Sequence, residues 1–285
     1  MSVSVVVETW NIAGDPEVLG KLLATLAPQL AAAEAELVIT HAGIAADARE
    51  RLAAIAARDV RWLELPAGAG YYEHKNAGFD ATTGDVVAFI DGDCDPVSDW
   101  LAELTAPFAA GARVVAGATS YAGLLAPLAN ELDFPYFDVR RRPFGALAAA
   151  PKAVLNFFAN NVAFARDVFA ARHYPTIEPM FHGQCQVLAL QLAEDGIPIA
   201  FALGALVVHA WPEGATEWLQ VRLLRGADTT RLLPYVLRTH APRARGIAER
   251  LGPLPALAVL GARAVTATWS ALRRGPALRG LALVA

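Results

Sequence analysis

Short, unbroken runs of apolar residues alternate along the first part of the chain with stretches in which apolar residues recur every three or four positions. The runs are rich in β-branched residues, which is typical of strands buried on both faces of a parallel sheet. The recurring pattern indicates amphipathic helices. The predicted strands are 3–7, 36–40, 60–65, 86–90 and 113–117; the predicted helices are one capped by Asp15, then 47–57, 71–82 and one that Ser98 or Asp99 begins. This alternation predicts βαβ units, and so an α/β fold with a mainly parallel sheet flanked by helices.

The second half of the chain is less regular. Residues 121–151 hold three prolines and the cluster Arg140-Arg141-Arg142, which predicts an irregular loop. A strand over 156–166, a helix over 181–194, a strand over 199–209 and a helix over about 216–224 are predicted to follow. The apolar stretch 254–272 is nearly long enough to span a membrane, but Arg263 lies at its middle, where a charge is costly. The tail fits a helix lying on a membrane surface or an Ala-rich packing helix equally well.

Three carboxylates follow the predicted strand 86–90 within five positions. They are Asp91, Asp93 and Asp95. Ligands of parallel sheets bind beyond the carboxyl ends of the strands, and residues two apart in extended chain point the same way, so Asp91 and Asp93 can face one site. Such oxygen ligands suit magnesium or manganese, usually together with substrate phosphates. From this stretch alone, metal–phosphate chemistry and a solvated polar turn are about equally good interpretations.

Composition narrows the class of protein. The chain of 285 residues is 55% hydrophobic with a mean hydropathy of +0.36, which leaves membrane contact open. Its net charge of −4 argues against a nucleic-acid partner, which normally requires a basic excess. Two cysteines cannot build a disulfide framework. The apolar run 3–7 is preceded by no basic segment of the kind that begins a signal peptide. We therefore expect a cytoplasmic protein, and a position at the inner face of the membrane stays open.

Three segments together resemble a known family. They are a polar turn with Asn11 after the first strand, the run Lys75-Asn76-Ala77-Gly78 leading into Asp91-Gly92-Asp93, and a later helix followed by a strand that ends at His209. In this order they resemble the family 2 glycosyltransferases of the GT-A fold, over residues 3–210. The resemblance implies a Rossmann-like GT-A domain over 1–230, with a nucleotide half to about 118 and an acceptor half from about 119. Residues 231–285 would form a helical C-terminal segment, for which membrane association stays open.

The resemblance also implies roles for individual side chains. The donor nucleotide would be bound by Glu8, Thr9, Asn11, His41, Lys75 and Asp91, with Arg222 and Arg225 near the leaving phosphates. A manganese or magnesium ion would be held by Asp93 and His209, and Asn160, Asn161 and Gln184 would lie on the acceptor side. Two of these assignments have a structural alternative: His209 as a core or capping histidine, and the two arginines as a solvated helix face.

Two departures from the family pattern concern base recognition and the catalytic base. Where the family's second strand ends in paired acids, this chain reads Thr40-His41-Ala42-Gly43, so uridine cannot be assumed as the base. Where the family commonly has Gly-Glu-Asp, with Asp as general base, this chain reads Gly183-Gln184-Cys185. Glu178, His182 and Cys185 are the base candidates, although an ordinary thiol is mostly protonated at neutral pH. Loss of a general base typically costs about 10²–10⁴-fold in rate.

The leading hypothesis is a metal-dependent inverting glycosyltransferase that moves a sugar from a nucleotide-diphosphate donor to an unidentified acceptor, which could be a glycan or lipid-linked. A non-catalytic GT-A module that binds nucleotide or glycan in a membrane-associated assembly is the alternative. Nucleotidyl transfer fits less well, because residues 8–14 contain no Lys or Arg. A zinc site shared by Cys94 and Cys185 with His41, His182 or His209 lacks the usual spacing, and we expect both cysteines to be small buried side chains.

Overall fold

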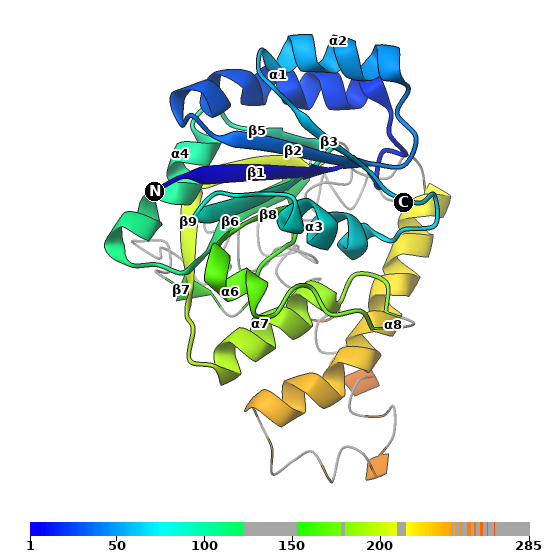
Figure 1. Ribbon diagram of the computed structural model, residues 1–285. Helices are drawn as coiled ribbons and strands as arrows, with labels where there is room; N and C mark the ends of the chain where they lie inside the picture. The colour runs from blue at the N-terminus through cyan, green and yellow to red at the C-terminus, as the bar shows by residue number, and fades with distance from the viewer. Residues whose placement is uncertain are drawn as a thin grey trace, which may run out of the picture.

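The computed structural model describes residues 1–121, 153–154, 156–177, 180–209 and 215–240, and single residues of the tail between 242 and 265 (Figure 1). The predicted loop 121–151 thus falls almost wholly outside the described residues, as do Glu178 and Arg263. Within the described part, helices cover both faces of one curved sheet. This α/β architecture confirms the predicted fold class.

The sheet joins a parallel half to a mixed half. Its strands run in the order β3-β2-β1-β4-β8-β6-β9-β5, and β7 also pairs with β9. The first four are parallel to one another, β8 is antiparallel to both β4 and β6, and β9 is parallel to β6. The bounds are β1 Val3–Glu8, β2 Glu36–His41, β3 Arg61–Glu64, β4 Val86–Asp91, β5 Cys94–Pro96, β6 Val114–Tyr121, β7 Ala153–Val154, β8 Asn161–Ala165 and β9 Ile199–His209.

Helices bury an apolar core on each face of the sheet. One cluster packs α1 (Pro16–Ala32), α2 (Ala46–Ala56) and α4 (Trp100–Thr105) against β1, β2 and β4. The other packs α3 (Tyr71–Asp80), α6 (Arg166–Ala170) and α7 (Gln184–Glu194) against the opposite face (Figure 1). A short 3₁₀ helix, η1 (Ala106–Ala110), follows α4, and α8 (Ala215–His240) packs beside α7. The sheet is therefore packed between two layers of helices, one on each face.

Local sequence explains where two helices lie. Asp15 Oδ1 accepts hydrogen bonds from the backbone N–H groups of Glu17 (2.8 Å) and Val18, so it caps α1 as predicted. Gly78 lets α3 approach the sheet, because a Cβ at this position would lie 2.4 Å from Val6 Cγ1. The glycine of the Lys75–Gly78 run is therefore a packing requirement.

Three predicted elements have different bounds in the structure. The strand expected over 156–166 begins only at Asn161, after a turn in which the Asn161 N–H bonds to the Phe158 carbonyl at 3.1 Å. The helix expected from 181 begins at Gln184, because Asp228 of α8 accepts from the N–H groups of Phe181 and His182. The helix expected over 216–224 extends through α8 to His240. Among the described residues, no helix is long and apolar enough to cross a membrane.

Candidate active site

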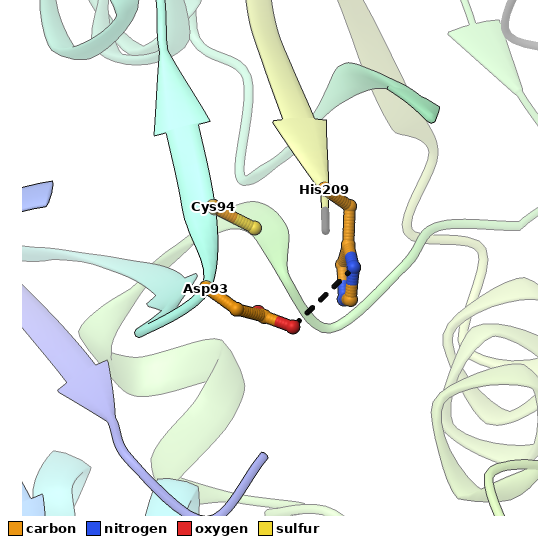
Figure 2. A group of neighbouring side chains, drawn as sticks. All are labelled: Asp93, Cys94 and His209. Atoms are coloured by element: carbon orange, nitrogen blue, oxygen red, sulfur yellow. Dashed lines mark ion pairs between the residues drawn. The ribbon is translucent and has the colours of Figure 1, made fainter. Parts of the chain in front are cut away.

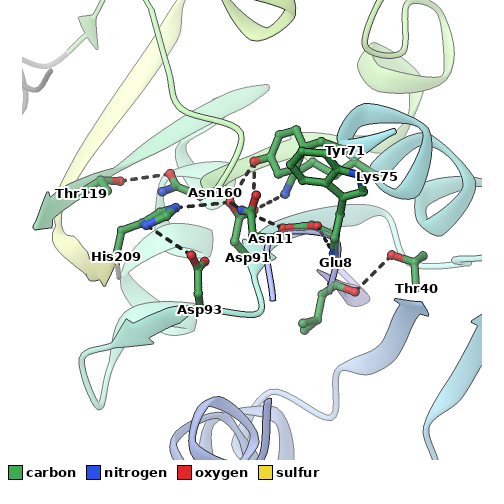
Figure 3. A network of polar contacts seen from close by, with 12 residues as sticks. Glu8, Asn11, Thr40, Tyr71, Lys75, Asp91, Asp93, Thr119, Asn160 and His209 are labelled. Atoms are coloured by element: carbon green, nitrogen blue, oxygen red, sulfur yellow. Dashed lines mark hydrogen bonds and ion pairs between the residues drawn. The ribbon is translucent and has the colours of Figure 1, made fainter. Parts of the chain in front are cut away.

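Four strand ends bring the candidate residues together. Glu8 ends β1 directly beside Asp91 at the end of β4, because the two parallel strands pair Glu8 with Asp91. The chain then turns through Gly92 and Asp93 into β5, whose Cys94 pairs with His209 at the end of β9. Gly92 is required at this turn, because a Cβ here would lie 2.9 Å from the Glu8 carbonyl oxygen. The acids and the histidine predicted from sequence therefore share one edge of the sheet (Figure 3).

Asp91 is the centre of a buried polar network. Its Oδ1 lies 2.5 Å from Lys75 Nζ, and its Oδ2 accepts hydrogen bonds from Asn11 Nδ2 at 3.0 Å and Tyr71 Oη at 2.9 Å. The Lys75 and Asp91 side chains are 0% and 2% exposed, so water screens this ion pair very little. The sequence motif that suggested nucleotide contacts thus places Lys75 directly against Asp91 (Figure 3).

The same contacts set the charges of the two neighbouring acids. Burial alone would raise the pKa of Asp91, but the Lys75 ammonium and His209 outweigh burial and hold this pKa below its ordinary value. Glu8 is fully buried, and burial together with the Asp91 carboxylate raises its pKa well above the ordinary value, although Lys75 opposes the shift. Asp91 is therefore the ionised member of the pair and Glu8 the one that holds a proton more readily.

Asp93 and His209 are the two predicted metal ligands that the structure brings together. His209 Nδ1 lies 3.5 Å from Asp93 Oδ2, and His209 Nε2 lies 3.6 Å from Asp91 Oδ2. Asp93 Oδ1 is buried and has no hydrogen-bond partner among the residues described, so it is an oxygen that a bound cation would satisfy. Burial and Asp91 raise the pKa of Asp93, with His209 acting in the opposite direction. One atom each of Asp93, Cys94 and His209 lie within 4.8 Å of one another (Figure 2). The donor set fits a divalent ion.

The predicted nucleobase side is built around a buried histidine. Thr9 Oγ1 donates to the Thr40 carbonyl at 3.0 Å and ties the ends of β1 and β2 together. His41 Nδ1 accepts from the backbone N–H groups of Gly43 and Ile44, so its Nε2 carries the ring hydrogen. Burial lowers the pKa of His41, which keeps the ring neutral. The imidazole thus fixes the turn that replaces the usual paired acids.

On the acceptor side, His182 lies against the network around Asp91. Its ring centroid is 4.9 Å from that of Tyr71 and 4.0 Å from that of Phe181, and its carbonyl accepts from Tyr72 Oη at 2.9 Å. Burial, followed by the charge of Arg225, lowers the pKa of His182 to about 3. A neutral imidazole is therefore held beside the candidate donor site.

The other residues predicted on the acceptor side are more deeply buried. The Cys185 sulfur lies 3.6 Å from the His182 carbonyl oxygen. Burial raises the pKa of the Cys185 thiol. Gln184 Nε2 donates to the Met180 carbonyl at 3.2 Å. Asn160 accepts from Thr119 Oγ1, whereas Asn161 Nδ2 donates to the Ala118 and Ala205 carbonyls and its Oδ1 accepts from Trp100 Nε1. Asn161 therefore joins β6, β8 and β9.

The structure separates the remaining predicted residues. Asp95 is exposed on β5, so the third acid of the 91–95 stretch stands apart from the buried pair. Arg222 lies on α8 with its guanidinium 5.8 Å from the Trp218 ring, and Arg225 follows on the same helix, close enough to His182 to lower its pKa. Glu178 falls outside the described residues.

Sequence reasoning missed two residues that build this site. Tyr71 donates to Asp91, and its position four residues before Lys75 on one helix face is a signal that could have found it. Asp228 accepts from the N–H groups of Phe181 (2.8 Å) and His182 (2.6 Å), and its place within an ordinary helical pattern gave no signal.

The sequence matches the family described as glycosyl transferase family 2 over residues 4–162, which is more than half of the chain. The chain belongs to the family 2 glycosyltransferases. The match spans β1 to the start of β8 and includes both Asp91 and Asp93. Membership makes the protein a glycosyltransferase, as the sequence motifs predicted. No curated protein sequence matches the chain significantly.

Solved structures share its fold. The mannosyltransferase PcManGT from Pyrobaculum calidifontis, in complex with GDP-Man and Mn²⁺, is 19% identical with a TM-score of 0.61; the alignment covers 99% of this chain and 86% of that one. Glucosyl-3-phosphoglycerate synthase from Mycobacterium tuberculosis, in complex with Mn²⁺, UDP-Glc and phosphoglyceric acid, is 19% identical with a TM-score of 0.54, covering 84% and 79%. The same enzyme in complex with Mg²⁺ and UDP is 18% identical, with a TM-score of 0.53 over 84% and 79%. These likenesses establish the GT-A fold of the chain.

Proposed function

We propose that this glycosyltransferase moves a sugar from a nucleotide-diphosphate donor to an acceptor hydroxyl with inversion at the anomeric carbon, using Mn²⁺ or Mg²⁺ held by Asp93 and His209. The observation that carries the proposal is the pairing of these two side chains at 3.5 Å, with Asp93 Oδ1 buried and unpartnered in the described part of the chain. The similar structures that contain UDP-Glc or GDP-Man also contain Mn²⁺, which supports a metal-assisted donor site.

The donor would be bound along the ends of β1, β2 and β4. When bound, the divalent ion would neutralise the charge that develops on the departing diphosphate. Asp91 holds Lys75, Tyr71 and Asn11 in fixed positions beside this site. We expect the nucleoside to lie near the strand ends that carry Glu8, Thr9 and His41, and we expect Arg222 and Arg225 of α8 to attract the phosphates.

His182 is the base that we propose for the acceptor hydroxyl. The hydroxyl oxygen would attack the anomeric carbon, the bond from that carbon to the diphosphate oxygen would break, and the hydroxyl proton would pass to the neutral imidazole. The pKa of about 3 leaves the ring unprotonated at neutral pH, and it also makes the ring a weaker base than an ordinary imidazole. Cys185 is a weaker candidate, because burial raises its thiol pKa. Asn160 and Gln184 would contact the acceptor, with Asn161 supporting the loop behind them.

Exposed apolar side chains on α8 and the tail support a lipid-linked acceptor and peripheral membrane contact as part of this proposal. Leu219, Leu223, Leu251, Leu254 and Leu257 are 49–67% exposed. Apolar side chains on an exposed helix, with arginines close by, are typical of helices that lie in the membrane interface. Flotation with vesicles containing anionic lipid tests this part. Equal recovery with and without vesicles would rule it out.

Calorimetry and donor hydrolysis test the metal site. We expect UDP or GDP to bind in a Mn²⁺-dependent manner, and the Asp93→Ala variant to lose Mn²⁺ affinity by at least about tenfold. Asp95→Ala is the matched control, because Asp95 belongs to the same stretch but is exposed. Release of free nucleotide from UDP-glucose or GDP-mannose should follow the same pattern. Absence of any nucleotide binding, or equal behaviour of the two variants, would refute the donor site; binding without hydrolysis would favour a non-catalytic module.

The base and the stereochemistry have a separate test. With water as acceptor, ¹H NMR of the first-formed free sugar should show the anomeric configuration opposite to that of the donor. His182→Gln should lower the hydrolysis rate by about 10²–10⁴-fold without changing nucleotide affinity. His173→Gln is the control, since the His173 ring pairs with Asp80 at 2.9 Å, away from this site. Retention of configuration would reject the inverting mechanism, and an unchanged rate in His182→Gln would reject His182 as the base.

A further inference from the structure

The metal seat contains a sulfur atom that the proposed donor chemistry does not require. Cys94 is the first residue of β5, and its register partner across the antiparallel β5–β9 pair is His209. Directly opposed residues of such a pair project to the same face of the sheet, so the Cys94 thiol and the His209 imidazole lie on one side. Asp93 reaches the same point from the preceding turn. Figure 2 shows the three side chains converging between the strand ends.

The distances are close to those of a coordinated ion. One potential ligand atom from each of Asp93, Cys94 and His209 lies within 4.8 Å of the other two. Around a tetrahedral zinc ion, ligand atoms at about 2.0–2.3 Å from the metal are separated by about 3.3–3.8 Å. The three atoms therefore need to approach one another by about 1.5 Å at most, which side-chain rotation can supply. The backbone of the antiparallel pair need not move.

The chemistry of the three atoms selects the kind of ion. Magnesium prefers oxygen ligands and leaves thiols uncoordinated, whereas thiolate, imidazole and carboxylate together suit zinc and cadmium. Cys94 is 3% exposed and forms no disulfide, so the sulfur is protected from other thiols. The other cysteine, Cys185, packs in the apolar cluster on the opposite face of the sheet and takes no part in this group.

We propose that Asp93, Cys94 and His209 form a three-ligand site for a thiophilic divalent ion such as Zn²⁺ or Cd²⁺. Asp93 and His209 are also the side chains assigned above to Mn²⁺ or Mg²⁺, so the thiophilic ion displaces the activating ion. To that extent the inference rests on the proposed function. On binding, the Cys94 S–H bond breaks, the proton leaves to solvent and the sulfur bonds to the metal. The protein then exists in two metal forms, one of them with the metal bound through Cys94.

Ultraviolet absorbance tests the sulfur ligand directly. Cadmium bound to thiolate gives a ligand-to-metal charge-transfer band. Titration of the metal-free protein with Cd²⁺ should therefore produce this band, and its absorbance should saturate at one Cd²⁺ per protein molecule. The band should survive in Cys185→Ser and disappear in Cys94→Ser, and Zn²⁺ affinity should fall by at least about tenfold in Cys94→Ser alone. The Mn²⁺ EPR signal should report release of Mn²⁺ when Zn²⁺ is added.

The outcomes separate this inference from the proposed function. No band in the wild type, or an equal band in Cys94→Ser, overturns the thiol ligand while leaving a Mn²⁺ site at Asp93 and His209 intact. Loss of Mn²⁺ binding in Asp93→Ala together with a retained Cd²⁺ band would instead contradict the shared site. If Cys94→Ser fails to fold, ¹¹³Cd NMR of the wild-type protein decides the question, because the cadmium shift distinguishes sulfur from oxygen and nitrogen ligands.

Discussion

Replacing Lys75 by methionine tests the buried ion pair at the centre of the site. The substitution keeps an unbranched apolar stem of similar length but removes the charge that lies 2.5 Å from Asp91 Oδ1. Both side chains are almost wholly buried, so Asp91 would be left as an uncompensated buried carboxylate. Removal of one partner of a buried pair typically costs about 3–5 kcal/mol, against a total unfolding free energy of about 5–15 kcal/mol. We expect the unfolding free energy of Lys75→Met to be about 3–5 kcal/mol lower than that of the wild type at pH 8.

A double-mutant cycle and a pH series test whether the destabilisation comes from the charge of Asp91. Lys75→Met combined with Asp91→Asn removes both charges, so the double variant should cost at least about 2 kcal/mol less than the sum of the single variants. In the wild type the pKa of Asp91 is lowered, so its contribution is present above the unfolded pKa of about 3.9 and lost as the pH falls through the folded value. Without Lys75 the pKa of this carboxyl rises, and the cost of the substitution should shrink between pH 8 and pH 5.

Urea denaturation followed by tryptophan fluorescence measures both effects. Lys21→Met is the matched control, because Lys21 is exposed on α1 and its replacement should change stability by less than about 0.5 kcal/mol. A cost below about 1 kcal/mol for Lys75→Met, additive single variants, or a cost that grows as the pH falls would each refute the reasoning.

Three further predictions follow from packing, hydrogen bonding and charge. Gly78→Ala should destabilise by about 1–3 kcal/mol in urea denaturation, because its Cβ would lie 2.4 Å from Val6 Cγ1, whereas Gly68→Ala, which meets no atom within 4 Å, should be nearly neutral. Asp228→Ala should raise amide hydrogen exchange at residues 181–182, since both N–H groups lose their acceptor; unchanged exchange would contradict this. Below about pH 6.5 the unfolding free energy of the wild type should fall, relative to that of His182→Gln, by up to about 1.4 kcal/mol per pH unit, because only the unfolded chain protonates the imidazole. Parallel curves of unfolding free energy against pH would show that the ring is not buried in neutral form.

The parallel half of the fold could be predicted from sequence because its signals are local. Apolar runs such as 86–90 report burial on both faces, and Asp15 with Pro16 marks the start of α1. The order of strands could not be predicted in the same way. The antiparallel insertion of β8 between β4 and β6 depends on pairing between residues far apart, and an apolar run does not specify its neighbours.

The site shows the same limit. Asp91, Asp93 and His209 could be predicted because strand ends carry them to a common edge, and the structure brings all three together. The start of α7 could not, since the residue that binds the N–H group of His182 is Asp228, 46 positions later. A hydrogen bond of that separation leaves no periodic signal in the sequence.

The difference between the two acids of the Asp91-Gly92-Asp93 turn follows from their partners and not from their type. Lys75, Tyr71 and Asn11 already occupy both oxygens of Asp91, so binding a cation there would require an existing buried contact to break. Asp93 Oδ1 has no hydrogen-bond partner within the described ranges, and its other oxygen faces His209. A cation at Asp93 therefore satisfies an oxygen that burial leaves unpaired, and the fixed negative charge of Asp91 adds to the attraction at short range. By this argument we expect Asp91 to maintain the electrostatic setting of the site and Asp93 to coordinate the metal.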